Sequence, residues 1–338
     1  MSNGEIPVFG TGGYMTSVDE CLYDGETTFI GRKGSINKPF YYNGKFWTVD
    51  TLFYTHSFNG ITPKFTYCLF QTINWLKYNE ASGVPSLSKD TIEKIKIKIP
   101  GLEEQNKIAK LMFALDERIT TQNKIIDKLQ SLIKGLNDFL YTQYGGEVLT
   151  SFAELGTSYS GLSGKSAQDF GSGKPFITYL NVYSNNAINE NDFQYVAIKD
   201  GEKQNIVEYG DVLFTLSSET PEEVGIGSVY LGKEKVYLNS FCFGIHITNT
   251  KVALPPYLSY YVSSTSFRKF IYPYAQGSTR FNLCKADFEK ARIKLPTLEN
   301  QKQIYSILSH IDNKIITERQ MLDLYNSQKQ YLLRQMFI

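Results

Sequence analysis

The feature that most constrains this chain is an internal repeat with a shift of 196 residues. The pattern (I/L)-P-x-L-E-x-Q occurs at residues 99–105 and again at residues 295–301. Matches extend without a gap from Leu87 on Leu283 to Thr121 on Thr317. Because a duplicated segment forms the same supersecondary unit in each copy, the repeat predicts one structural module used twice.

A long helix is predicted after each of the two repeat prolines. Pro100 and Pro296 both precede a turn with an acidic residue, which the helix dipole favours, and neither Pro nor Gly recurs for about thirty residues. Alternating steps of four and three residues meet mostly apolar side chains in both copies, which is typical of a coiled-coil seam. The predicted seam residues are Ile108, Met112, Leu115, Ile119, Ile126, Leu129, Ile133 and Leu136 in the first copy, and Ile304, Leu308, Ile311, Ile315, Leu322 and Leu332 in the second.

An apolar stripe of this length requires a partner helix. Each large apolar side chain gains about 1.5 to 3 kcal/mol on burial, and the duplicated copy is the obvious partner. Gln122 and Glu318 occupy the same seam position in the two copies. A polar residue there either fixes the register of the pair or reaches solvent near a helix crossing. A helix from Ile108 to Leu140 would be about 48 Å long.

The remaining segments predict mixed α and β structure. Short runs rich in Val, Ile, Phe, Tyr and Thr, such as Thr27–Ile30 and Asp211–Thr215, indicate strands, and helical stretches are predicted near Pro63–Tyr78 and Pro256–Tyr272. We therefore predict an α+β chain in four parts: a domain at 1–99, a coiled-coil helix at 100–144, a second domain at 145–295 and a second helix at 296–338.

The two predicted domains are unequal in length. Two full copies of the repeat would need 392 residues, 54 more than the 338 present. The first domain lacks the loop-rich opening segment of the second, and Gly4–Val8 is predicted to match Gly173–Ile177. Either the chain begins downstream of an ancestral start or its first domain is a shorter natural variant. A missing strand would leave a sheet edge that needs cover, for example from another chain.

Composition excludes several classes of protein. Lys and Arg (35) nearly balance Asp and Glu (34), so the chain has neither a polybasic arm nor an acidic tail, although a local basic face remains compatible with the sum. We expect a cytoplasmic location, because the sequence shows no signal peptide and no apolar run of about 18 residues. The four cysteines and three histidines are scattered, which favours buried reduced thiols over a metal site.

Three motifs that suggest enzymes do not fit their patterns. Gly161–Ser166 would need glycine at the position of Tyr159 to form a phosphate-binding loop, and Gly10–Gly13 lacks the spacing of a dinucleotide-binding turn. Leu254–Tyr257 has leucine where adenine methyltransferases carry Asn, Asp or Ser, so it lacks the side chain that would accept a hydrogen bond from a flipped base. We expect no catalytic residue and no cofactor in this chain.

The chain resembles the DNA-specificity (S) subunits of type I restriction-modification enzymes over essentially its whole length. The resemblance rests on the repeated proline motif, on L/I-D-x-(K/R)-I at Leu115–Ile119 and Ile311–Ile315, and on loops that begin at Ala81 and Ala275. It implies two target-recognition domains separated by two long antiparallel helices with a pseudo-two-fold axis, each domain reading half of a bipartite DNA site. It also implies two methyltransferase (M) subunits, which use S-adenosylmethionine, and restriction (R) subunits, which use ATP and Mg.

Several loops combine hydroxyl, amide and basic side chains, which suit contacts with phosphates and base edges. For each residue the alternative is a solvated polar loop. The candidate DNA-binding residues are Tyr14, Arg32, Lys33, Ser35, Asn37 and Lys38 in the first domain, and Thr157, Ser158, Tyr159, Ser160, Lys165, Ser166, Lys174, Gln276, Ser278, Thr279, Arg280 and Asn282 in the second.

The leading hypothesis is a noncatalytic DNA-recognition subunit. The first alternative is a truncated structural or regulatory scaffold that binds M subunits without full DNA recognition. The second is a half-functional subunit that pairs with another copy of itself.

Overall fold

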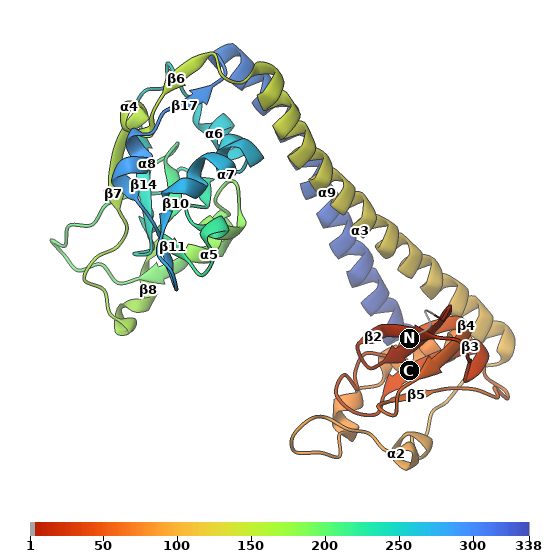
Figure 1. The fold of residues 1–338 in the computed structure, drawn as a ribbon. Coiled ribbons are helices and arrows are strands. Elements are labelled where there is room, and N and C mark those ends of the chain that lie inside the picture. Colours follow the sequence, from red (N-terminus) through yellow and green to blue (C-terminus); the bar gives the residue numbers. More distant parts are fainter. Residues whose placement is uncertain (1–3, 338) are drawn as a thin grey trace. The chain divides into compact units, whose positions relative to one another are not determined.

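The computed structural model describes residues 4–337, so residues 1–3 of the predicted first domain and residue 338 of the predicted second helix lie outside the described part. The chain forms two compact units (Figure 1). The first contains Met1–Ile126 and Glu318–Ile338, and the second contains Asp127–Thr317. Each unit therefore contains one α+β head and one portion of both long helices. We call residues 4–99 the first head and residues 145–295 the second head.

The two predicted helices are present as α3 (Leu102–Tyr144) and α9 (Leu298–Met336). Each begins two residues after its repeat proline, with Glu103 and Glu104 or Glu299 in its first turn. These carboxylates lie next to the free backbone N–H groups and positive dipole end of the helix, which stabilises both starts.

In the first unit the two helices pair in antiparallel directions. The Nζ of Lys329 lies 2.5 Å from Oδ1 of Asp116, and the Nε2 of Gln122 donates to the backbone oxygen of Glu318 at 3.1 Å. Gln122 also donates to the Glu318 carboxylate. Residue numbers therefore rise along α3 as they fall along α9. Because Gln122 and Glu318 are related by the repeat, each contacts its own equivalent, as happens at a two-fold axis.

None of the predicted seam residues is exposed. Both Gln122 and Glu318 are buried, and their mutual hydrogen bonds favour a role in register over solvent contact. The buried seam residues are Ile108, Met112, Leu115, Ile126, Ile133, Ile304, Leu308 and Ile315, and the half-buried ones are Ile119, Leu129, Leu136, Ile311, Leu322 and Leu332.

The first head is built on one five-stranded sheet of order β2-β1-β4-β3-β5. Aromatic side chains of this sheet, with Phe9, Phe29 and Phe46 buried, form its core. The strands are β1 (Ile6–Gly10), β2 (Gly13–Val18), β3 (Tyr23–Gly31), β4 (Phe40–Thr48) and β5 (Leu52–Tyr54), followed by α1 (Pro63–Thr72), the 3-10 helix η1 (Trp75–Tyr78) and α2 (Lys89–Glu93). The predicted helical stretch Pro63–Tyr78 is thus interrupted after Thr72.

The second head contains four smaller sheets, of orders β12-β10-β14-β7, β11-β16-β15, β13-β8-β9 and β17-β6. Its strands are β6 (Val148–Thr150), β7 (Gly156–Ser160), β8 (Phe170–Ile177), β9 (Gln194–Val196), β10 (Val212–Thr215), β11 (Ser217–Ser218), β12 (Gly227–Val229), β13 (Tyr237–Leu238), β14 (Cys242–Ile247), β15 (Ala275–Gln276), β16 (Phe281–Leu283) and β17 (Ile293–Leu295). Its helices are α4 (Phe152–Leu155), η2 (Ala167–Asp169), α5 (Tyr179–Ser184), η3 (Glu190–Asp192), η4 (Pro221–Glu223), α6 (Pro255–Tyr261), α7 (Thr265–Ile271), η5 (Tyr272–Tyr274) and α8 (Lys285–Lys290).

The two heads share a core topology. Strands β3 and β5 pair in antiparallel fashion as β10 and β14 do, and β1 pairs with β4 in parallel as β8 does with β13. In the parallel pair of the first head Val8 lies opposite Trp47, and in the equivalent pair of the second head Phe176 lies opposite Tyr237. This register sets Pro7 against Pro175, so the predicted match of Gly4–Val8 with Gly173–Ile177 is wrong by one residue. The error arose because the short motif had no gap-free context on either side.

Candidate nucleic-acid interface

The glutamine of the repeated proline motif ties the first head to its helix. The side chain of Gln105 is fully buried. Its Oε1 accepts a hydrogen bond from the backbone N–H of Thr62, and its Nε2 donates to the carbonyls of Gly60 and Pro100, all at 2.9 Å. Thr62 is the N-cap of α1, so one side chain fixes the start of α1 against the start of α3.

Gln301 makes the same three bonds in the second unit. Its Oε1 accepts from the N–H of Leu254 at 2.7 Å, and its Nε2 donates to the carbonyls of Val252 and Pro296 at 2.8 Å. Leu254 is the N-cap of α6, the counterpart of α1. Both heads are thus attached to their helices by the same buried hydrogen-bond clamp.

A hairpin formed by β15 and β16 carries five of the predicted DNA-binding residues. Gln276 pairs with Asn282 across the two strands, and Ser278, Thr279 and Arg280 lie in the exposed turn between them. The turn requires glycine at Gly277, because φ is +135° there and a Cβ would lie 2.3 Å from the carbonyl oxygen of Arg280. Amide, hydroxyl and guanidinium groups are therefore presented together on one short hairpin.

Neighbouring segments orient Arg280. Its Nε lies 3.3 Å from Oγ of Ser217 on β11, and its guanidinium lies 5.9 Å from the ring centre of Phe241. The Phe241 side chain is 56% exposed. Sequence reasoning missed both Ser217 and Phe241, because each lies far from the hairpin in sequence and belongs to no motif.

The loop residues near β7 and β8 divide into exposed and buried ones. Thr157, Ser160 and Lys174 are exposed and Ser158 is half-buried, so all four have at least part of their surface in solvent. The prediction for Tyr159 is wrong: its side chain is buried and its hydroxyl donates to Asp211 at 2.6 Å. Burial, assisted by the Asp211 carboxylate, raises the pKa of Tyr159 far above its usual range. Alternation along β7 points Ser158 and Ser160 to the opposite face of the strand from Tyr159.

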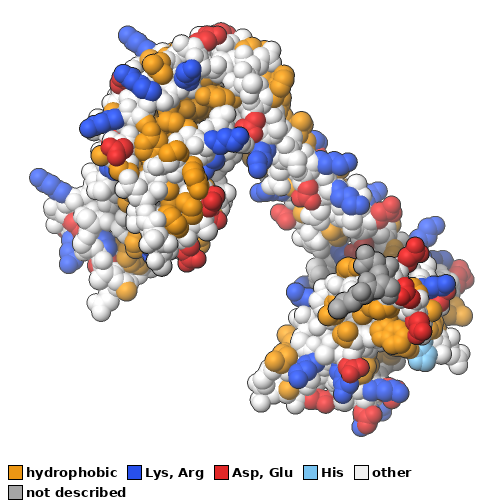
Figure 2. Space-filling model, viewed as in Figure 1, with side chains coloured by type: hydrophobic (Ala, Val, Ile, Leu, Met, Phe, Trp, Pro, Cys, Tyr) orange, Lys and Arg blue, Asp and Glu red, His pale blue; other side chains and the backbone are white. Residues whose placement is uncertain are grey.

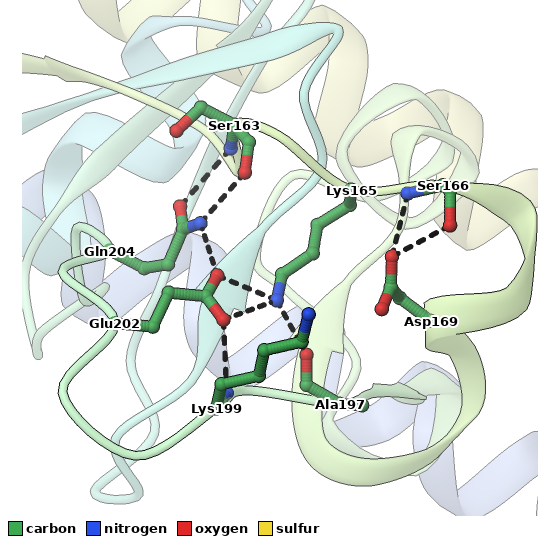
Figure 3. A network of polar contacts seen from close by, with 8 residues as sticks. All are labelled: Ser163, Lys165, Ser166, Asp169, Ala197, Lys199, Glu202 and Gln204. Atoms are coloured by element: carbon green, nitrogen blue, oxygen red, sulfur yellow. Dashed lines mark hydrogen bonds and ion pairs between the residues drawn. The ribbon is translucent and has the colours of Figure 1, made fainter.

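The side chain of Lys165 is already engaged in a network of polar contacts, which disfavours a contact with DNA (Figure 3). Its side chain is only 6% exposed, and its ammonium donates to the carbonyl of Ala197 at 2.6 Å and lies 2.6 Å from Oε1 of Glu202. The Glu202 carboxylate also accepts from the N–H of Lys199 and from Gln204. The prediction was wrong because a lysine in a glycine- and serine-rich loop was assumed to point to solvent.

This network has a definite pH dependence. Hydrogen bonds from Lys165, Lys199 and Gln204 lower the pKa of Glu202 from 4.5 to about 2. Since the pKa falls on folding, the interaction stabilises the folded chain above about pH 4.5, and the contribution is lost as the pH falls toward 2.

Ser166 is exposed, but its local bonds are already made. Its backbone N–H and its Oγ both donate to the carboxylate of Asp169, which forms a capping box at the start of η2 (Figure 3). A phosphate at this position would compete with the Asp169 carboxylate, so Ser166 is a weaker candidate than its exposure suggests.

In the first head, the predicted residues Arg32–Lys38 lie beside the counterpart of the second-head hairpin. Lys33 forms a β-bridge with Ser86, and Ser217 pairs with Asn282 in the second head. The repeat sets Ser86 on Asn282, so the two pairs are equivalent. Lys33, Asn37 and Lys38 are exposed and Ser35 is half-buried. The guanidinium of Arg32 lies 6.0 Å from the ring centre of Phe53, and Tyr14 lies on β2, where it is 64% exposed.

The loop Ala81–Ser86 was not predicted as part of this surface. Asn79 shapes it: its Oδ1 accepts from the N–H groups of Ala81 and Ser86, and its Nδ2 donates to the Ala81 carbonyl. The register of the repeat, which sets Ser86 on Asn282, was the signal that could have identified it. On the face in view in Figure 2, basic and acidic side chains are interspersed.

The family model for the type I restriction modification DNA specificity domain matches residues 1–131 and 156–324. The chain belongs to this family. A putative type I restriction enzyme specificity subunit of Methanocaldococcus jannaschii is 27% identical over 291 residues, which cover 77% of this chain and 64% of the relative. One from Haemophilus influenzae is 22% identical over 352 residues, with 97% and 86% covered. The chain therefore spans slightly less than two thirds of the first of these specificity subunits.

Solved structures of the family share the fold. The type I restriction-modification S subunit of M. genitalium superposes with a TM-score of 0.63 at 13% identity and covers 100% of this chain and 90% of that one. A chain from a study of complex assembly and conformational transition of the type I R-M system gives a TM-score of 0.59 at 14% identity, with 98% and 91% covered. The predicted fold class, an α+β specificity subunit with an internal repeat and two long helices, is confirmed.

Within residues 4–337 no three His, Cys, Asp or Glu side chains lie close enough together to hold a metal ion. Across the same range, no helix combines the length and the apolar character that crossing a membrane demands. Cys68 and Cys242 are buried, Cys284 is half-buried and Cys21 is exposed.

Proposed function

We propose that this specificity subunit is the noncatalytic DNA-recognition component of a type I restriction-modification system, and that its two heads read the halves of a bipartite double-stranded target. The observation that carries this proposal is the equivalent placement of a polar exposed segment in both heads, with Lys33 beside Ser86 and Ser217 beside Asn282. Two related readers on a pseudo-two-fold scaffold match the geometry by which symmetric proteins bind paired half-sites.

The chemistry of the second-head hairpin suits base readout. An arginine such as Arg280 can form two hydrogen bonds with guanine, and amides such as Gln276 and Asn282 can do so with adenine. Exposed lysines such as Lys33 and Lys174 suit phosphate contacts, which position a protein on DNA without reading its sequence. Such contacts require double-stranded DNA with an accessible major groove.

We further propose that the helices dock two M subunits and that R subunits join this assembly. After pairing, α3 still exposes Leu111, Ile125, Leu132 and Phe139, whose numbers differ by multiples of seven. A second apolar stripe at this spacing suits helices of a partner subunit. The structural neighbour from a study of type I R-M assembly supports partners of this kind. Adenine methylation, with S-adenosylmethionine, and ATP-dependent cleavage would then belong to the partners.

The test uses the chain reconstituted with its cognate M subunit and a pool of labelled duplexes. We expect selection of a split sequence, and substitution Arg280→Ala should weaken binding to the selected duplex by about 5- to 150-fold, equivalent to 1–3 kcal/mol. Arg280→Lys is the matched control, because it keeps the charge but loses the two-pronged hydrogen bond. Unchanged selectivity in both variants would exclude a reading role for the hairpin, and methyl transfer by the purified chain alone would exclude a noncatalytic subunit.

A second candidate function is a scaffold that binds M subunits without full DNA recognition. The smaller first head favours it, because the opening segment of the second head has no counterpart among residues 4–99. In this case the duplex pool yields no sequence preference with or without M subunits, whereas binding to M persists.

A further inference from the structure

In the second head, one short segment closes the core. Strand β6 pairs with β17, with Thr150 opposite Ile293 and Val148 opposite Leu295. The following helix α4 inserts Phe152, whose side chain is fully buried. The centre of the Phe152 ring lies 5.2 to 6.0 Å from the ring centres of Phe214, Phe267 and Phe288.

The first head contains the counterparts of this aromatic cluster without the residue that closes it. Ile30, Trp75 and Ile92 lie together with Phe53 in one hydrophobic cluster. By the shared strand pairing Ile30 and Phe53 take the places of Phe214 and Phe243, and the repeat sets Ile92 on Phe288. Phe288 and Phe243 are buried, but their counterparts Ile92 and Phe53 are only half-buried. Because the strand register sets Pro7 on Pro175, Phe152 has no sequence counterpart among residues 4–99.

The counterparts of the residues that β6 covers in the second head are exposed in the first. Ile293 and Leu295 are 2% and 0% exposed, whereas their repeat counterparts Ile97 and Ile99 are 46% and 41% exposed. The segment around Ile97 and Ile99 lies in no strand. Strand β5 is an edge strand of its sheet, whereas its counterpart β14 is paired on that side with β7. Two neighbouring positions of the first head therefore lack the cover that the second head has.

Charge indicates which kind of segment fits this opening. Exposed lysines at positions 94, 96 and 98 alternate with isoleucines at 95, 97 and 99. In the second head Arg292, the repeat counterpart of Lys96, lies 2.5 Å from the carboxylate of Glu154 on α4. Lysines at a free edge discourage indiscriminate strand pairing, while a segment with a matching glutamate would satisfy them.

We propose that the open side of the first head binds an extended segment of a partner protein that is not a second copy of this chain. The segment has the chemistry of residues 147–160: an apolar strand that leads into one helical turn with a leading phenylalanine, a glutamate two residues later and a leucine after it, followed by a second strand as β7 follows α4. Strand addition supplies backbone hydrogen bonds, and the aromatic residue supplies specificity. This interaction concerns the side of the head formed by Phe53, Ile92, Ile97 and Ile99, and it can be measured without DNA.

The first experiment titrates the full chain into a labelled synthetic peptide with the sequence of residues 147–160. We expect saturable one-to-one binding that is lost, by at least tenfold in affinity, when the peptide carries Phe152→Ser or the chain carries both Ile97→Lys and Ile99→Lys. Because both isoleucines are exposed, the chain variant should fold normally, which its thermal unfolding midpoint checks. Absence of binding, or binding insensitive to these changes, overturns the proposal.

The second experiment supplies the segment in the same chain. Counting back from Pro7, which occupies the place of Pro175, residues 145–168 placed ahead of Met1 enter the first head in the register they have in the second. We expect the midpoint followed by tryptophan fluorescence to rise by about 3 °C or more, and not to rise in a fusion whose added segment carries Phe→Ser. No rise overturns the proposal. A chain dimer that Ile97→Lys abolishes also overturns it, because the occupant is then a second copy.

Discussion

The buried clamp formed by Gln105 and Gln301 permits a direct test of modularity. Substitution of either glutamine by methionine keeps a similar volume but removes one acceptor and two donor contacts. The change leaves one backbone N–H and two carbonyls without a partner in a site where the glutamine is fully buried. Each buried unsatisfied group costs about 1–3 kcal/mol, so we expect the three groups together to lower the free energy of unfolding of the affected unit by at least about 3 kcal/mol.

The chain itself provides a reporter for one unit. Both of its tryptophans, Trp47 and Trp75, lie in the first unit, and Trp75 is buried with its indole N–H bonded to the Phe70 carbonyl at 2.8 Å. Tryptophan fluorescence during denaturant unfolding therefore follows the first unit, whereas far-ultraviolet circular dichroism follows both. Gln105→Met should lower the midpoint of the fluorescence transition, and Gln301→Met should mainly change the dichroism.

The exposed neighbour Asn106 provides the matched control, because Asn106→Ala alters the same turn of α3 without a buried bond. That variant should stay within about 0.5 kcal/mol of the parent. A loss of less than about 1 kcal/mol for both methionine variants would refute the assignment of the clamp as a buried hydrogen-bond centre. Equal fluorescence shifts for Gln105→Met and Gln301→Met would refute the independence of the two units.

Three further predictions follow from the polar contacts. Glu202→Gln removes the charge partner of Lys165 and should lower the thermal midpoint at pH 7. The difference from the parent should shrink as the pH falls from about 4.5 toward 2, because Glu202 becomes protonated. A pH-independent difference contradicts the ion-pair assignment. Gln122→Glu places a second carboxylate against that of Glu318 and should destabilise the helix pair by about 1–3 kcal/mol at pH 7. Circular dichroism should show that stability recovers in acid. No recovery in acid points to a steric cause. Arg280→Ala should change the free energy of unfolding by less than about 0.5 kcal/mol, because the residue is exposed. A large loss, measured by denaturant unfolding, would mean that its DNA phenotype is indirect.

The fold was largely predictable because its signals are periodic or repeated. The seven-residue stripe specified both long helices, and the repeat paired Gln122 with Glu318 before any contact was known. The break after Thr72 and the register of Pro7 were not predictable, because each depends on tertiary packing rather than local pattern. For the candidate interface, residue type suggested the right loops but could not distinguish Lys165, whose ammonium is buried against Glu202, from an exposed lysine such as Lys174. The remaining exposed DNA-binding candidates stay predictions.

The Gln122 and Glu318 pair also explains what duplication within one chain makes possible. At a true two-fold axis between identical subunits, this buried position would hold two glutamines or two glutamates. Two buried carboxylates in contact repel each other and force one to take up a proton. In a fused repeat the two copies can diverge, so an amide that donates faces a carboxylate that accepts. The same freedom allowed the heads to diverge in size, and the buried pair disfavours the association of two glutamate-bearing halves, in which two carboxylates would meet at this position.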